Sequence, residues 1–242
     1  QWARLDYNQQ EPRMLVHYAL LRKIRGSKEA CEAYKQKEAD FHTLVAEMAD
    51  IDRKTAKTIN LGIMYGMGTF KLGQMLNLNY NAATILLEKY HGNVPFVKGL
   101  MHEASKAALY RGEIKTLLGR KRHFDYWEPA DSTLRWPNKE MPLRKIDAEK
   151  VWKGRPLRRA YTHKALNALI QGASADLTKK AMLDLYTELN VVPHLQVHDE
   201  IDISYKDENE LKKIAQIMEN CVELEVPLKV TLEKGPSWGE CK

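Results

Sequence analysis

Two acidic stretches near opposite ends of this sequence carry the side chains best suited to chemistry. They are "DYNQQEPR" at residues 6–13 and "QVHDEI" at residues 196–201. Asp6 ends a short strand pattern and Asp199 lies at an expected hairpin tip. Mg²⁺ prefers a few carboxylates together with phosphate oxygens and water, and two such ions can serve both oxygens of a phosphoryl transfer. Taken singly, either acid is more often an ordinary turn residue, so their meeting is a hypothesis.

A third stretch, "RKTAKTINLGIMYGMG" at residues 53–68, has its cations at one end. At about 100° per residue, Arg53, Lys57, Leu61 and Tyr65 form one stripe along a helix. The stripe passes from cations to an apolar residue and then an aromatic ring, which is the order of properties in a nucleoside triphosphate. The same pattern also fits an amphipathic helix with solvated cations, or a nonspecific phosphate patch.

The positive charge of the chain is concentrated in one segment. The net charge is +6, and residues 111–159 contain 14 Lys and Arg against 7 Asp and Glu. A polyanionic partner would explain this block. A solvated basic loop explains it equally well.

Composition narrows the class of protein. A chain of 242 residues with 44% hydrophobic residues can bury a sizeable core. No apolar run is long enough for a membrane span, so no membrane association is expected. Cys31, Cys221 and Cys241 are isolated, which argues against zinc or disulfides and favours a reducing, intracellular compartment. The sequence opens on Gln1 without a secretory leader pattern and reads as part of a longer chain.

The elements that would position these residues follow from periodicity and punctuation. Asp52 is a plausible N-cap for the helix at residues 53–64. A hairpin is expected at residues 194–205, because apolar and polar residues alternate on both sides of His198 and Asp199. We expect strands at residues 3–7 and 227–232, a loop-rich stretch at residues 119–156, and helices at residues 11–24, 29–38, 42–48, 69–76, 81–110 (interrupted near 92–95), 157–189 and 207–224. This order predicts an α+β fold in which a small antiparallel sheet carries a large helical insertion.

Together and in this order, the three stretches resemble the motifs of family A DNA polymerases. "DYNQQEPR" resembles that family's motif A, DYSQIELR, "RKTAKTINLGIMYG" resembles motif B, R-x3-K-x7-YG, and "QVHDE" resembles motif C. "NALIQGASAD" at residues 167–176 resembles the family's NAxxQGxxAD helix. The resemblance runs from about residue 4 to residue 239.

The resemblance implies a template-directed DNA polymerase that adds deoxynucleotides to a primer 3′-hydroxyl by two-metal nucleotidyl transfer. It implies a palm at residues 1–20 and 151–242, with fingers and a basic connecting segment at residues 21–150. Two Mg²⁺ ions, with Mn²⁺ as a possible substitute, primer–template DNA and dNTPs would be its cofactors and partners. A cytoplasmic location, in a bacterial cell or a phage-infected host, is expected. The family's thumb and exonuclease precede motif A, so an upstream region or a companion chain is expected to supply them.

The resemblance also implies roles for individual residues. Asp6 and Asp199 would hold the metals, Glu200 would assist them, and Lys57 would be a candidate general acid. The expected nucleotide-binding residues are Arg53, Lys57, Leu61, Tyr65, His42, Gln9 and Glu11, with Glu11 as the steric gate against a ribose. The expected DNA-binding residues are Asn167, Gln171, Gln196, His198, Arg120, Lys121 and Arg122. A capping or core role for His42, and plain surface polarity for Asn167 and Gln171, are the alternatives.

Two departures from the family pattern are informative. Leu61 stands where the family usually has Phe or Tyr, so slower, more selective incorporation and poor acceptance of dideoxynucleotides are expected. His163 stands where the family has an Arg that contacts the primer, which puts that contact in doubt. Two other functions remain open: a single-subunit RNA polymerase, against which Glu11 and the His198–Glu200 triplet argue, and a primer–template-binding fragment without catalysis.

Overall fold

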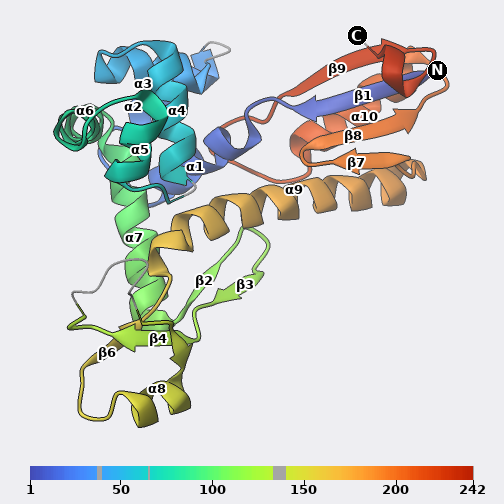
Figure 1. Cartoon of the computed structure of the whole chain (residues 1–242). Coiled ribbons are helices and arrows are strands. Elements are labelled where there is room, and N and C mark those ends of the chain that lie inside the picture. Colours follow the sequence, from blue (N-terminus) through green and yellow to red (C-terminus); the bar gives the residue numbers. More distant parts are fainter. Residues whose placement is uncertain (37–39, 65, 133–139, 242) are drawn as a thin grey trace.

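The main sheet draws its strands from both ends of the chain. The computed structural model describes residues 1–36, 40–64, 66–132 and 140–241. Four antiparallel strands lie in the order β7-β8-β1-β9. They are β1 (Trp2–Tyr7), β7 (Leu195–Val197), β8 (Glu200–Ser204) and β9 (Val230–Gly235). Both termini lie at the same end of this sheet (Figure 1).

Alternation along β1 separates an apolar face of the sheet from a charged one. Ala3, Leu5 and Tyr7 are buried, whereas Arg4 and Asp6 between them are half-buried. Successive side chains of a strand point to opposite faces. Tyr7 donates from its hydroxyl to the Met218 carbonyl at 2.8 Å, so the apolar face packs on α10 (Glu208–Asn220), which in turn packs on α9 (Ala165–Leu189). The opposite face is left to Arg4, Asp6 and their neighbours.

A cluster of helices follows β1 and stands beside the sheet (Figure 1). Side-chain caps fix where two of them begin: Asp40 accepts from the Thr43 N–H and Asp52 from the Thr55 N–H, both at 3.0 Å. The cluster contains α1 (Gln10–Leu21), α2 (Ser27–Gln36), α3 (Phe41–Ala49), α4 (Arg53–Met64), α5 (Thr69–Leu76) and α6 (Tyr80–Asn93). Pro95 begins α7 (Pro95–Arg111) and explains the interruption expected near residues 92–95.

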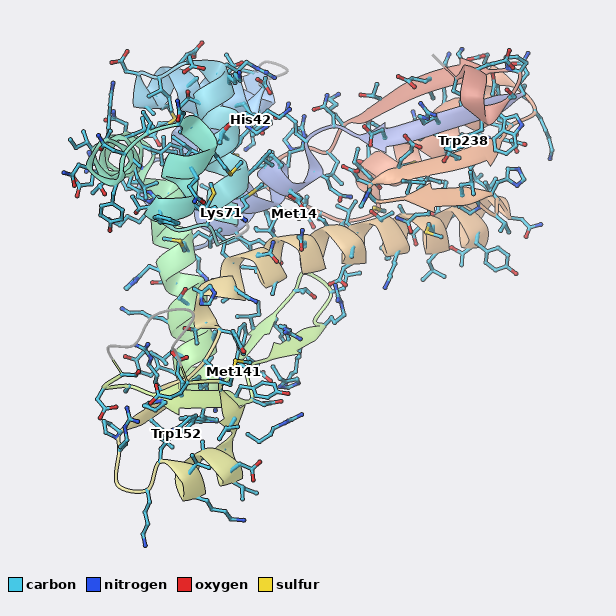
Figure 2. The ribbon with its side chains drawn as sticks, in the orientation of Figure 1. Met14, His42, Lys71, Met141, Trp152 and Trp238 are labelled. Atoms are coloured by element: carbon cyan, nitrogen blue, oxygen red, sulfur yellow. The ribbon has the colours of Figure 1, made fainter. Side chains whose placement is uncertain are left out.

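A smaller lobe at the far end of α7 differs from expectation. It contains the hairpin β2 (Glu113–Lys115) and β3 (Lys121–His123), and a sheet in the order β5-β4-β6. Its other elements are β4 (Tyr126–Pro129), β5 (Leu143–Arg144), α8 (Lys145–Val151), β6 (Leu157–Arg159) and the 3₁₀ turn η1 (Thr162–Lys164). Figure 2 places Trp152 and Met141 in this lobe, away from His42.

The expectation of a loop-rich stretch at residues 119–156 was therefore wrong for its described part. So was the start of the next helix at residue 157, because α9 begins at Ala165. The strands have two to four residues, too few to display alternation. In addition, Glu128 is buried in β4 against Arg158, at 3.0 Å, where an apolar residue would have signalled a strand.

The α+β fold class is confirmed, with a small antiparallel sheet and a large helical insertion. The expected hairpin at residues 194–205 is present as β7 and β8. Across the described ranges, no helix combines the length and apolarity needed to cross a membrane. Cys31, Cys221 and Cys241 are free thiols. The division into palm and fingers at residues 20 and 150 stays a prediction.

Candidate active site

The sheet brings Asp6 and Asp199 side by side at the end of β1. Asp6 lies opposite Glu200 in the β1–β8 register, and the Tyr7 N–H donates to the Asp199 carbonyl at 3.3 Å. His198 adopts a left-handed backbone conformation, with φ of 56°, at the turn between β7 and β8. This turn carries Asp199 back toward the strand that holds Asp6. Two acids from opposite ends of the sequence thus share one corner of the sheet.

The charges at this corner favour a bound cation. The pKa of Asp6 is raised to about 6, by burial most of all and then by the negative charges of Asp199 and Glu233, against the opposing charge of Arg4. Two neighbouring carboxylates are hard to ionise at the same time because their negative charges repel. A cation bound between them stabilises the doubly ionised form. No group of three or more His, Cys, Asp or Glu side chains forms a complete metal site in the part of the chain that the structure describes. The donor set still fits Mg²⁺, which takes its remaining ligands from water and phosphate.

Glu200 is held differently from the two aspartates. Its carboxylate forms an ion pair with Arg4 at 3.3 Å, and Arg4 also pairs with Glu233 at 3.1 Å. Burial raises the pKa of Glu200, with the charge of Asp202 next in size and the Arg4 charge opposing both. Glu200 therefore lies next to Asp6 and Asp199, but its carboxylate is paired with Arg4 and is less available than theirs to bind a metal ion.

A cavity of about 660 Å³ opens beside Asp199. Segments far apart in the sequence line it: the start of α1, the start of α3, the last turn of α4, α9 and the β7–β8 turn. The lining residues are Gln9, Gln10, Glu11, Pro12, His42, Leu61, Met64, Gln171, Ser174, Ala175, His198 and Asp199. Seven of these belong to the set expected from the sequence. The volume suits a nucleotide-sized ligand.

Arg53 and Lys57 stand near the part of this cavity formed by His42. Burial is the main reason that the pKa of His42 is lowered. The charge of Asp40 opposes this effect, and the positive charges of Arg53 and Lys57 add to it. Arg53 donates from Nε to Asp40 at 2.7 Å. Burial would raise the pKa of Asp40, but hydrogen bonds from Arg53 and Thr43 outweigh it and hold the pKa at about 2. Lys57 is exposed and makes no ion pair with a described residue, so it is the cation more available to a ligand.

Two residues that the sequence did not single out fix the imidazole of His42. Its Nδ1 lies 3.1 Å from Asn60 Nδ2, and the Tyr90 hydroxyl donates to Asn60 Oδ1 at 2.5 Å. Asn60 and Tyr90 are 1% and 0% exposed, so the hydroxyl proton needs that acceptor. The amide therefore turns its N–H₂ toward Nδ1, which must accept. The proton of the neutral ring then lies on Nε2, where it can be donated to an anion.

Glu11 and Gln9 make contacts that restrict their expected roles. Burial raises the pKa of Glu11, and the charge of Asp199 adds to this, while a hydrogen bond with Gln171 opposes it. The Gln9 side-chain oxygen accepts from the Phe41 N–H at 2.7 Å and from the Tyr34 hydroxyl at 3.1 Å. Gln9 thus ties the start of α1 to α2 and α3. Tyr65 lies outside the described residues, and its role stays a prediction.

A second cleft, of about 670 Å³, runs from the first cavity toward the small lobe. Gln171 and Ala175 line both. The other lining residues are Thr116, Arg120, Lys121, Arg122, Phe124, Tyr126, Tyr161, Lys164, Asn167, Ala168 and Gly172. Asn167 and Gln171, four residues apart on α9, therefore face the same cleft as the basic run.

The cations of that basic run are not equally available. Arg120 is bound to Asp176 at 2.8 Å and to the Gly172 carbonyl at 2.6 Å. Lys121 pairs with Glu113 at 3.0 Å. Arg122 is exposed, without an ion pair to a described residue. Gln196 lies outside both cavities and donates to the His198 carbonyl at 2.5 Å, which supports the turn.

Comparisons with known proteins point to one family. The family model described as "DNA polymerase family A" matches residues 1–240. A DNA-directed DNA polymerase of Pseudomonas phage M6 is 36% identical over 280 aligned residues, which cover 98% of this chain and 38% of that protein. DNA polymerase I of Geobacillus stearothermophilus is 32% identical over 247 residues, which cover 98% of this chain and 26% of that protein. The chain thus spans well under half the length of these curated relatives.

A solved structure gives the same result. The POL domain of Pol1 from M. smegmatis, in complex with DNA primer-template and dNTP, superimposes with a TM-score of 0.75 at 27% sequence identity. The match covers 98% of this chain and 40% of that chain.

Proposed function

The chain belongs to DNA polymerase family A, and from that membership we propose that it performs template-directed addition of deoxynucleotides to a primer 3′-hydroxyl. One observation carries the proposal most directly. Asp6 and Asp199 lie together at the edge of a cavity lined by Glu11, His42 and Leu61. The names of the relatives support the same activity.

On this proposal, Asp6 and Asp199 hold two Mg²⁺ ions, for which Mn²⁺ can substitute. When bound, such ions stabilise negative charge on the attacking and leaving oxygens of the transfer. The acidic corner lies at the edge of the cavity, so a primer terminus placed there is next to a triphosphate inside. The primer 3′-hydroxyl loses its proton to solvent, its oxygen forms a bond to the α-phosphorus, and the bond from that phosphorus to the pyrophosphate oxygen breaks.

The residues of the chain bind and orient the nucleotide. Lys57 and Arg53 hold the phosphates, and Lys57 gives a proton to the departing pyrophosphate. His42 donates from Nε2 to a phosphate oxygen, which its partner Asn60 permits. Glu11, in the cavity beside Gln171, crowds a ribose 2′-hydroxyl and favours dNTPs. Primer–template DNA occupies the cleft along Asn167 and Gln171.

Primer extension tests the proposal directly. The chain is incubated with a labelled primer–template, Mg²⁺ and one dNTP at a time. We expect extension with the nucleotide complementary to the template, and its loss on chelation of the metal. Binding of the DNA without extension would favour a non-catalytic binding fragment, and preference for rNTPs would favour an RNA polymerase.

Leu61 is expected to limit both the rate and the acceptance of dideoxynucleotides. It is 36% exposed at the cavity and cannot stack on a sugar or base as an aromatic ring does. Leu61→Phe should raise the incorporation of dideoxynucleotides relative to dNTPs by about tenfold, given the worth of an aromatic contact. Steady-state rates with both substrates measure this. Met75→Phe, on exposed α5 outside the cavity, is the control, and unchanged selectivity in Leu61→Phe would contradict the prediction.

Tyr90 is expected to act on nucleotide binding through Asn60 and His42. Tyr90→Phe removes only the hydroxyl and allows the Asn60 amide to turn, so the KM for dNTP should rise roughly two- to tenfold with little change in kcat. In a His42→Ala background the same substitution should have no further effect. Tyr205→Phe is the control, because it loses a hydroxyl bonded to Gln1 at 2.6 Å, far from the cavity. An equal KM change in both backgrounds would show that Tyr90 acts only through stability.

A further inference from the structure

The charged face of the main sheet carries a cation among its acids. Arg4 and Asp6 share this face of β1, because they are two residues apart on the strand. The register places Asp202 of β8 and Glu233 of β9 on the two sides of Arg4, and it places Glu200 opposite Asp6. A guanidinium therefore lies within the group of acids that borders the candidate metal site.

Contacts on the β9 side hold Arg4 in place. Its Nη1 donates to the Glu233 carboxylate at 3.1 Å, and its Nη2 donates to the Trp238 carbonyl at 3.5 Å. Its Cζ lies 5.9 Å from the centroid of the Trp238 ring, within the range of a cation–π contact. Figure 2 shows Trp238 beside the sheet. The remaining nitrogen, Nε, is the one that pairs with the acids of β8.

The acids of β8 are paired with Arg4 at different distances. Glu200 Oε2 lies 3.3 Å from Nε, and Asp202 Oδ1 lies 3.9 Å from it. The Asp202 side chain is 0% exposed, so a negative charge there is unfavourable without a counter-ion. Glu200 is a diagonal neighbour of Arg4, although it lies directly opposite Asp6. Its carboxylate is thus paired with a residue other than the one that it faces across the strands.

Without this pairing, Glu200 could bind the same ions as Asp6. Cβ atoms of directly opposite residues in an antiparallel pair are about 4.5–5.5 Å apart, so the carboxylates of Glu200 and Asp6 could share one ion. A third carboxylate would increase the affinity for a divalent cation, because affinity rises with the charge of the ligands. It would also take a position that Mg²⁺ otherwise fills with water or a phosphate oxygen.

We propose that Arg4 is a positioning residue for the metal site, because it keeps Glu200 paired and leaves the ions to Asp6 and Asp199. This inference rests on the proposed polymerase function, which needs ions with positions open to phosphate oxygens. Arg4 thereby sets how tightly the site binds divalent cations.

Binding of Mn²⁺ to the whole chain, followed by electron paramagnetic resonance without DNA or dNTP, tests this role. Arg4→Met should bind Mn²⁺ about tenfold more tightly than the parent, the lower end of the usual effect of a residue that holds a metal ligand. In a Glu200→Gln background, the same substitution should change the Mn²⁺ affinity little. A residue that served only stability would leave the affinity unchanged or weaken it.

A paired variant separates this effect from folding. Arg4→Met alone leaves Asp202 buried without its cation, which destabilises the fold. Arg4→Met combined with Asp202→Val replaces the ion pair by apolar residues of similar volume, a change that is often neutral or stabilising. This double variant should bind Mn²⁺ as tightly as Arg4→Met does.

Three further variants test the position of the charge and of the ion. Arg4→Lys keeps a cation beside Glu200 and should keep the affinity of the parent. Lys234→Met removes a positive charge from the opposite face of the sheet, where Lys234 pairs with Glu208 of α10 at 2.9 Å, and should leave the affinity unchanged. Asp199→Asn should weaken binding, which would place the measured ion at the acidic corner.

The outcomes distinguish this inference from the proposed function. Unchanged Mn²⁺ affinity in Arg4→Met and in the double variant, or equal tightening in the Glu200→Gln background, overturns the role of Arg4 and leaves the polymerase proposal intact. Tightening that depends on Glu200, in a chain that does not extend a primer, supports the role of Arg4 at the metal site and overturns the polymerase proposal.

Discussion

Replacing Asp199 with asparagine is expected to slow single-nucleotide incorporation by roughly a thousandfold or more. The amide keeps the size of the side chain but removes one of the two charges that would balance the metal ions. Rapid-quench measurement of the first incorporation, at saturating Mg²⁺ and dNTP, gives this ratio. A loss of less than tenfold would contradict the placement of the metals at this corner.

The same substitution has a consequence that can be measured without metal. Burial is the largest cause of the raised pKa of Asp6, and the charge of Asp199 is the next. Asp199→Asn removes that charge, so the Asp6 carboxylate should form more readily. The pKa of Asp6 should therefore fall below about 6 while staying above its ordinary value. A ¹³C NMR titration of the side-chain carboxyl in metal-free protein follows it.

Glu200→Gln is the matched control for this corner. Glu200 is paired with Arg4 at 3.3 Å and lies opposite Asp6 in the register. Loss of its charge should reduce incorporation far less than the loss of the Asp199 charge. Both variants should bind primer–template in metal-free buffer as the parent does. Equal losses of activity would mean that Glu200 is an obligatory ligand, contrary to its pairing with Arg4.

The proximity of Asp6 and Asp199 could be predicted from the sequence because the strands that carry them have recognisable local patterns. Alternation around His198 and Asp199 predicted the hairpin, and the short pattern ending at Asp6 predicted β1. A small antiparallel sheet leaves few places for these strands except beside one another. The start of α4 and its exposed cations could be predicted in the same way, and the structure shows Asp52 as its cap and its apolar side buried.

The hydrogen bonds that orient the side chains of the site could not be predicted from the sequence. Asn60 stands among the buried residues of α4, and its partners His42 and Tyr90 come from two other helices. Nothing in local periodicity relates three such positions. The lobe was missed for a similar reason: Trp127 lies opposite Leu143 on one side and Arg159 on the other, in strands too short to show a pattern.

Lys57 and Arg53 looked alike in the sequence, and the structure separates them. Arg53 is engaged by Asp40 at 2.7 Å, whereas Lys57, one turn along α4, has no such partner among the described residues. Lys57→Leu should therefore lower kcat/KM for dNTP by about a hundredfold to ten thousandfold, the range for loss of a general acid. Arg53→Leu should cost less, because Asp40 already takes part of its charge. Single-turnover kinetics over a range of dNTP concentrations measure both.

Two further variants divide the binding and proton-transfer roles of Lys57. Lys57→Arg keeps a positive charge near His42 but cannot release a proton at ordinary pH. Its KM for dNTP should stay close to that of the parent while kcat falls as far as in Lys57→Leu. Lys28→Leu removes an exposed cation of α2 that lines neither cavity, and should leave both constants unchanged. If Lys57→Arg restored kcat, Lys57 would act as a charge alone, and the proton for pyrophosphate would come from solvent.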